Sequence, residues 1–199
     1  MSIFDIFWGL FALSLLAPVV AGVVKIYNQI KLNQAAATRA WSNVLITESQ
    51  KSKVLNSMES TLTNAQAFET QVLTDLTELR MGLGKLSDSI PNQAAHQMLS
   101  SIEQQSSNLA SKLHVTAEAY PALQTSAIFQ SLMLEISQLN TMVTERITDY
   151  NKAVEDLNGH LSTFPCNLLN GLFFRVPKMP RFSLGSEHFD SYNPYSSKR

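Results

Sequence analysis

The sequence predicts an all-α protein, with an N-terminal transmembrane helix followed by an elongated antiparallel bundle of three to four long helices. Three observations predict this class. Residues 3–24 form a nearly uninterrupted apolar run, later apolar residues recur about every 3.5 positions, and no alternating strand pattern of useful length appears. We expect four segments: an anchor at 1–25, a helical bundle at 26–165, an apolar and basic segment at 166–182, and a flexible tail at 183–199.

The apolar run at 3–24 contains one charged residue, Asp5. As a helix it would span about 33 Å, enough to cross a hydrocarbon core of about 30 Å. The alternatives fit less well, because a cleaved signal peptide has basic residues before a shorter apolar core, and a buried core helix is rarely apolar on every side. The residues that follow are basic, which predicts a cytoplasmic bundle and a short N-terminus outside. These flanking residues, also candidates for contact with the membrane surface, are Lys25, Lys31 and Arg39.

Three helical stretches follow the anchor, at 26–86, 92–119 and 121–164. No proline interrupts the first stretch, which would be about 90 Å long if unbroken, so a kink or self-association is an open alternative. The second stretch ends at Tyr120, because a residue before proline avoids the α region, and Pro121 suits the first turn of the third. The third stretch carries the most regular apolar stripe, at Phe129, Leu132, Ile136, Leu139, Val143, Ile147, Tyr150, Val154, Leu157, Leu161 and Phe164.

The segment at 166–182 differs from the bundle in charge and in backbone preference. Its apolar start is followed by basic residues, while Pro177 and Pro180 prevent a regular helix. Such a segment could lie on an anionic membrane surface, through Arg175, Lys178 and Arg181. The alternative is a short strap that packs on the end of the bundle.

Composition and motifs exclude several classes of function. The net charge is −1, from 15 Lys and Arg against 16 Asp and Glu, so we expect no nucleic-acid partner. The single Cys166 cannot form an intramolecular disulfide or a zinc site built from cysteines. No phosphate-binding loop, zinc-protease motif or nucleophile elbow is present, and His114 with Glu118 supplies only two metal ligands. We therefore expect no catalytic residue, metal, cofactor or small-molecule substrate.

Short motifs along the chain resemble those of the LemA family. Glu118-Ala119-Tyr120-Pro121-Ala122-Leu123 is similar to the family's EAYPxL element. Other matches lie after the anchor and near the end of the bundle. The matching residues outside the EAYPxL element are Tyr27, Asn28, Trp41, Arg146, Tyr150, Asn151, Asn158, Phe164 and Pro165.

The resemblance implies a single-pass protein of the bacterial inner membrane with no established enzymatic activity. It further implies a protein partner in the membrane, with a membrane metalloprotease as one candidate. We therefore expect a non-catalytic scaffold or adaptor. The alternative is a self-assembling protein that organises or shapes membranes, since bundles with little surface charge readily form homo-oligomers. A signalling or transport subunit ranks third.

Overall fold

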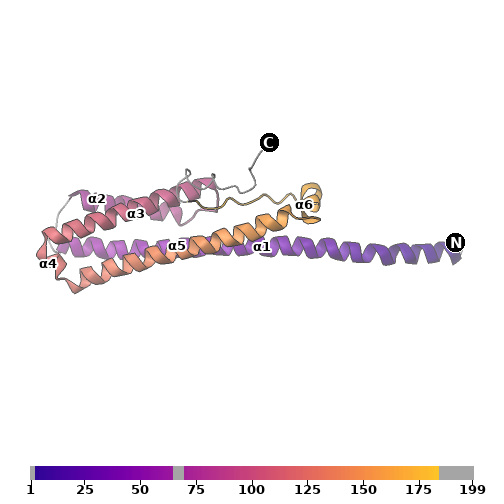
Figure 1. The fold of residues 1–199 in the computed structure, drawn as a ribbon, viewed down its shortest axis with the longest axis horizontal. Helices are drawn as coiled ribbons and strands as arrows, with labels where there is room; N and C mark the ends of the chain where they lie inside the picture. Colours follow the sequence, from indigo (N-terminus) through magenta and orange to yellow (C-terminus); the bar gives the residue numbers. More distant parts are fainter. Residues whose placement is uncertain (1–2, 65–69, 184–199) are drawn as a thin grey trace, which may run out of the picture.

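The structure, a computed structural model, describes residues 3–64 and 70–183, and within these ranges it describes all side chains except those of 3–13 and 15. The described residues form a bundle of helices in which one helix extends far beyond the others (Figure 1). This arrangement confirms the predicted all-α class. The elements are α1 (Ile3–Asn64), α2 (Thr70–Leu86), α3 (Gln93–Ala119), α4 (Pro121–Gln124), α5 (Ala127–Ser162), α6 (Cys166–Leu169) and the π-helical turn η1 (Asn170–Phe174).

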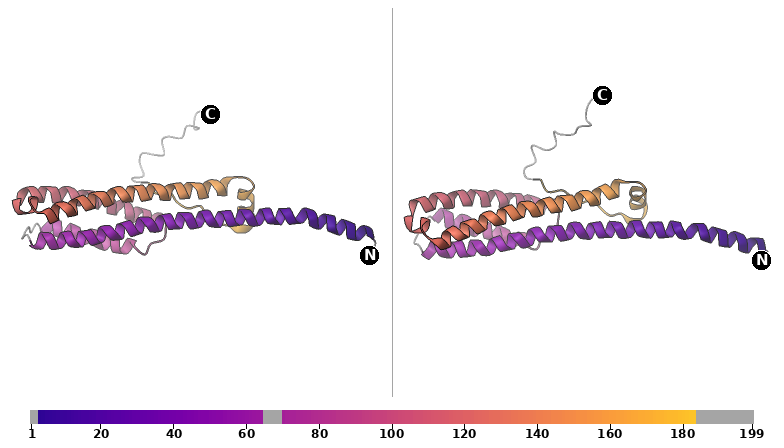
Figure 2. Two further views of the ribbon diagram at one scale, coloured as in Figure 1. Left: turned by 90° about the horizontal axis from the view of Figure 1, so that it is seen from below. Right: turned by 60° about the horizontal axis from the view of Figure 1, so that its bottom comes forward.

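Ion pairs between helices define the direction of the first three. Glu59 near the end of α1 pairs with Arg80 of α2, and Asp75 of α2 pairs with Lys112 of α3. Each pair joins two consecutive helices that are linked by a short connection. Such helices can lie side by side only if they run in opposite directions. The helices α1, α2 and α3 therefore alternate in direction along the bundle, and α5 runs antiparallel to α1 beside them (Figure 2).

The register between α1 and α5 is set by aromatic and apolar contacts. Trp41 of α1 lies against Tyr150 of α5 with ring centroids 5.3 Å apart, and Ile30 shares a core cluster with Leu161. The two helices are antiparallel and rise equally per residue. The sequence numbers of two residues that face each other across the pair therefore add up to about 190. The start of α5 therefore lies opposite about residue 64, and its end at Ser162 lies opposite about residue 29.

The stretch 26–86 does not form one unbroken helix, and the self-association that the sequence left open stays a prediction. The described chain ends α1 at Asn64 and starts α2 at Thr70. In an unbroken helix Glu59 and Arg80 would lie about 31 Å apart, yet their side chains form an ion pair. The physical reason is that α5 begins opposite residue 64, so a longer α1 would have no partner for its apolar stripe. Folding back places that stripe against α1 and α3 instead, through Val72, Leu76, Leu79, Leu83 and Leu86.

The other helix boundaries follow local sequence signals. Asn92 caps α3, with its Oδ1 accepting from the backbone N–H of Ala95 at 2.8 Å. The predicted third stretch starts later than expected, because Pro121 opens only the short α4, and Ser126 then caps α5 by accepting from the N–H of Phe129. The stripe of α5 is buried as predicted from Phe129 to Leu161, except that Leu132 is only partly buried.

Phe164 is a correction to that stripe. The sequence placed it on the buried face, but its side chain is 79% exposed. The reason is that α5 ends at Ser162 and Thr163 adopts an extended conformation as the C-cap, so Phe164 no longer follows the helical periodicity.

Among the described residues, no helix is both long and apolar enough to cross a membrane. Much of the expected anchor, residues 3–13 and 15, has side chains outside the described part. The anchor therefore stays a prediction. The expected tail also falls mostly outside the description, which ends at Ser183.

Candidate functional site

Residues 175–182 form an extended strap that runs back along α5 from the end of the bundle. They follow η1, where Arg175 takes a left-handed conformation (φ 50°) that ends the helical turn. The expectation that Pro177 and Pro180 would prevent a helix is confirmed, because residues 175–183 contain none. Residues 175–182 pack on the bundle, which agrees with one of the two alternatives for the segment 166–182, while the contact of this segment with a membrane surface stays a prediction.

Asparagine side chains hold the strap through its backbone. Asn158 donates from Nδ2 to the carbonyl of Met179 (2.8 Å) and accepts at Oδ1 from the N–H of Met179 (3.0 Å). Asn151 pairs with Phe182 in the same way, at 2.9 and 2.8 Å. Each amide thus satisfies both polar groups of one extended residue, as a neighbouring β-strand would, and none of these bonds involves a strap side chain.

The spacing of the two asparagines matches the geometry of the strap. Residues 151 and 158 are two turns apart on α5, which is about 10.5 Å along the helix axis. Met179 and Phe182 are three extended residues apart, which is about 10 Å. The two pairings therefore keep in step, with the strap running antiparallel to α5. A third pairing closes the turn before the strap, where Asn170 donates to the carbonyl of Val176 and accepts from its N–H.

An aromatic cluster lies where the strap ends. Tyr150 donates from its hydroxyl to the carbonyl of Pro180 at 2.9 Å, and burial raises the pKa of Tyr150 to about 12, so it stays a donor at neutral pH. His96 of α3 packs against Tyr150 and Phe182, with ring centroids 5.4 and 5.6 Å away. Trp41 completes the cluster and donates from Nε1 to the carbonyl of Ser89 at 3.1 Å. The cluster thus joins α1, α3, α5 and the strap.

Neither ring nitrogen of His96 has a hydrogen bond of normal geometry, although the neighbouring backbone of Arg181 slightly opposes the effect of burial on its pKa. Burial lowers the pKa of His96, so the ring is neutral at pH 7. A hollow of about 300 Å³ lies beside it, lined by neutral amides and hydroxyls and by Arg181. These groups provide hydrogen bonds, but they do not pair a nucleophile with a general base.

A buried charge cluster lies deeper in the bundle. Lys51 is fully buried, with its Nζ 3.2 Å from Glu48 Oε2 and 2.7 Å from Glu103 Oε1. Burial, opposed by Lys51 and reinforced by the Glu103 carboxylate, raises the pKa of Glu48 to about 8. A single lysine therefore neutralises a site in which Glu48 is protonated at pH 7. This cluster was missed in the sequence, although Glu48 and Lys51 continue the apolar stripe at the spacing of Val44 and Leu55.

The structure brings together Trp41, Tyr150, Asn151 and Asn158 among the residues expected from the family motifs, and it separates the rest from them. Tyr120 and Pro121 form the turn between α3 and α4, where they shape the connection. The other motif residues are exposed. Tyr27, Asn28, Phe164 and Pro165 lie near the end of the bundle from which α1 projects, and Arg146 lies on α5. Arg146 forms an exposed ion pair with Asp149 at 3.4 Å.

The candidate membrane-surface residues are all exposed but lie at different heights. Lys25, Lys31 and Arg39 lie along α1. Arg175 starts the strap, whereas Arg181 lies near its other end, about level with Arg39 in the register of α1 and α5, and pairs with Glu155 at 3.6 Å. Lys178 lies between these two, so the six residues are spread along the length of the bundle instead of gathering at one height.

No group of three or more His, Cys, Asp or Glu side chains in the described part of the chain is placed to hold a metal ion. His114 and Glu118 lie exposed on α3. Cys166 is buried, and burial raises the pKa of its thiol, which keeps it protonated at neutral pH.

Comparison with known proteins supports the resemblance seen in the motifs. No protein of the curated set matches the chain. The family model of the LemA family matches residues 40–194, which include α2 to α6, the strap and all residues of the asparagine and aromatic contacts. The chain belongs to the LemA family.

Proposed function

We propose that the protein is a non-catalytic, membrane-anchored helical scaffold or adaptor that presents its bundle to a partner in the membrane. The observation that supports this most directly is the register of α1 against α5. Because α5 ends opposite about residue 29, α1 continues for about 39 Å beyond its long partner, as one helix that begins at Ile3.

The projecting part of α1 leaves apolar side chains uncovered. Leu16, Val19, Val20 and Val24 are 51–61% exposed. Uncovered apolar surface at this density is unfavourable in water, and a lipid bilayer is the environment that covers a single projecting helix on every side. This supports an anchor at 1–25.

The basic residues after the anchor support its orientation. Lys25, Lys31 and Arg39 are exposed on the bundle side of the apolar run, and the positive-inside rule places that side in the cytoplasm. The proposed location is the bacterial inner membrane, with the short N-terminus outside. The family resemblance adds a membrane metalloprotease as a candidate partner.

The test of the anchor is the distribution of the full chain between membrane and high-speed supernatant after lysis without detergent. We expect the wild type in the membrane fraction. Leu16→Lys combined with Val20→Lys should release it, because a lysine costs about 2.5–3.5 kcal/mol at the centre of a span, close to Leu16, and the lysine at Val20 adds a smaller cost nearer the interface. The matched control is Val115→Lys with Leu134→Lys, two apolar residues equally exposed on the bundle. Wild-type chain in the supernatant would overturn the proposal.

The test of the adaptor role is cross-linking in native membranes followed by mass spectrometry of the purified chain. A defined membrane protein should be recovered with the wild type and with the bundle control. Recovery of large homo-oligomers alone would contradict the adaptor role and favour the self-assembling alternative.

A further inference from the structure

We infer that residues 164–174, here called the cap, insert apolar side chains into the bilayer interface beside α1. This inference rests on the proposed anchor and adds a second membrane contact to it. The cap comprises α6, η1 and the two residues before them. Its uncovered apolar side chains are Phe164, Leu168, Leu172 and Phe173, which are 79%, 54%, 62% and 71% exposed.

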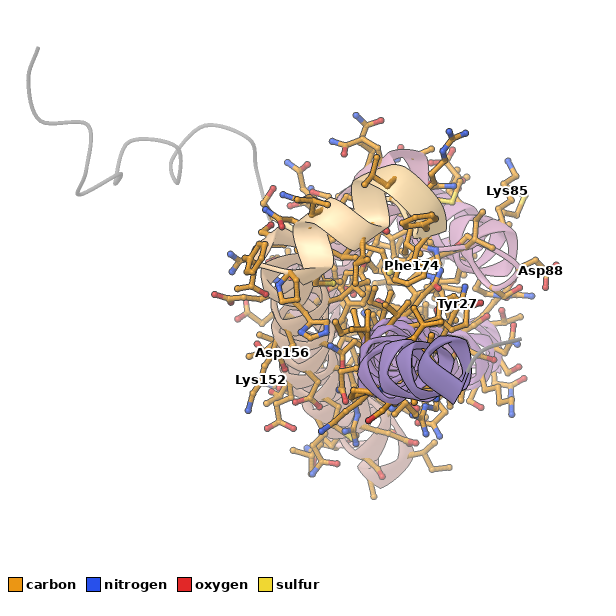
Figure 3. All side chains as sticks on the ribbon, turned by 90° about the vertical axis from the view of Figure 1, so that its right-hand side faces the viewer. Tyr27, Lys85, Asp88, Lys152, Asp156 and Phe174 are labelled. Atoms are coloured by element: carbon orange, nitrogen blue, oxygen red, sulfur yellow. The ribbon has the colours of Figure 1, made fainter. Side chains whose placement is uncertain are left out.

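The cap lies at the end of the bundle from which α1 projects. Figure 3, viewed along that end, shows Tyr27 of α1 and Phe174 of η1 pointing toward one another. Their ring centroids are 5.1 Å apart with planes inclined by 55°. A small separate core beneath them, formed by Ile30, Leu157, Leu161, Cys166 and Val176, attaches the cap to both α1 and α5.

This attachment sets the height of the cap relative to the anchor. Tyr27 follows Val24, the last residue of the apolar run, by three residues, or about 4.5 Å along the helix. An apolar surface at the membrane interface is buried about 5–10 Å into the boundary between headgroups and acyl chains. A cap fixed beside Tyr27 therefore lies at the depth where its exposed Leu172 and Phe173 meet that boundary.

The charges around the cap favour lipid as the covering partner. Between Phe164 and Ser183 the chain has three basic residues and no Asp or Glu, and no acid lies between Asp5 and Glu48 on α1. Lys31 places its Nζ 5.7 Å from the centre of the Tyr27 ring. On α5 the last acids are Glu155 and Asp156, which lie level with about residue 35 of α1, or about 12 Å from Tyr27 toward the bundle. The apolar side chains of the cap are therefore bordered on the cap, the strap and the start of α1 by basic residues and aromatic rings. This border matches an anionic lipid surface, which attracts lysine and arginine at its headgroups.

The rest of the bundle surface does not share this pattern. Other exposed apolar residues, such as Val115 and Ile128, belong to different helices and are separated in sequence by polar residues. Single exposed apolar residues are normal on a protein surface. The cap is distinct because four such residues lie within ten positions of one short segment.

The inference is tested by nitroxide labels on the full chain in vesicles of phosphatidylcholine and phosphatidylglycerol. Single variants Phe173→Cys, Val20→Cys and Ile128→Cys place labels on the cap, on the anchor and on the far end of the bundle, where Ile128 is 66% exposed. The wild type, whose Cys166 is buried, controls for labelling of the native thiol. Collision rates with oxygen, which concentrates in lipid, are compared with those for a water-soluble nickel chelate.

We expect the label at Phe173 to collide at least about tenfold less with the chelate than the label at Ile128, while remaining accessible to oxygen. A label at Phe173 as accessible to the chelate as that at Ile128, with Val20 in lipid, would overturn the cap contact and leave the anchor intact. A label at Val20 accessible to the chelate would refute the anchor and the cap together. Exclusion of both collision partners, with spin–spin broadening between cap labels, would indicate a second copy instead of lipid and would overturn the inference.

Discussion

The pairing of Asn158 with Met179 gives the sharpest test of how the strap is held. Asn158→Ala removes two hydrogen bonds of 2.8 and 3.0 Å between neutral groups. At about 1 kcal/mol of net stabilisation for each bond, the free energy of opening the strap at Met179 should fall by about 2 kcal/mol. Since about 1.4 kcal/mol corresponds to a factor of ten, the exchange rate of the Met179 amide hydrogen should rise about 30-fold.

The assay is hydrogen exchange of the full chain in detergent, resolved at the amides of Met179 and Phe182. Asn158→Ala should affect Met179 first, and Asn151→Ala should affect Phe182 first, because each asparagine pairs with one residue. Asn108→Ala is the matched control, since Asn108 is an exposed asparagine within α3 and the substitution changes only helix propensity.

A second substitution separates the two bonds. Asn158→Asp keeps an acceptor for the Met179 N–H but replaces the donor with a carboxylate oxygen that faces the Met179 carbonyl. It should open the strap at least as much as alanine at pH 7. The reasoning would be refuted if Met179 stayed as protected in Asn158→Ala as in the wild type.

The remaining predictions concern the buried polar groups and one glycine. Because the pKa of Glu48 rises from 4.5 unfolded to about 8 folded, the folded state binds the extra proton, and stability should decline as pH rises from about 4.5 through about 8. Glu48→Gln should abolish that decline in urea unfolding followed by circular dichroism, and an unchanged slope would contradict the assignment. Lys51→Met leaves two carboxylates without a counter-charge and should destabilise the fold by about 3–5 kcal/mol at pH 9, and by less at pH 6, where Glu48 is protonated; equal losses would count against this explanation. The pKa of His96 is lowered by burial, so its contribution has the opposite sign: stability is present above about pH 6.5 and is lost as pH falls. His96→Phe should flatten that acid loss in the same titration, and a persisting loss would assign it to other groups. Gly159→Ala adds a Cβ that meets nothing within 4 Å inside α5, and should raise stability by about 0.5–1 kcal/mol; a decrease in thermal midpoint would disprove the open space at this position.

Local sequence signals predicted the boundaries of the bundle better than its topology. Pro121 and the helix N-cap residue Asn92 act on the backbone within a few residues, so the ends of α3 could be expected from the sequence alone. The return of the chain between Asn64 and Thr70 could not, because residues 65–69 include no glycine or proline. It depends on where α5 begins, more than sixty residues later.

The candidate site follows the same division. Asn151 and Asn158 were identified through the family resemblance, but their partners lie 31 and 21 residues away, and no local pattern links an asparagine to a distant backbone. Asn170 gave no signal of its own. The charges at Glu48 and Lys51 interrupted an apolar stripe, and only the presence of Glu103 on a different helix explains how they are accommodated.

Because the asparagine amides contact main-chain atoms alone, the chemical identity of the exposed strap residues is free to vary. Lys178 and Arg181 can each be exchanged for an unrelated residue without breaking a hydrogen bond between an asparagine side chain and the strap. The bundle therefore contains a built-in position for a reporter, where a fluorophore or short epitope would be held at a fixed distance from α5 by a support indifferent to its sequence.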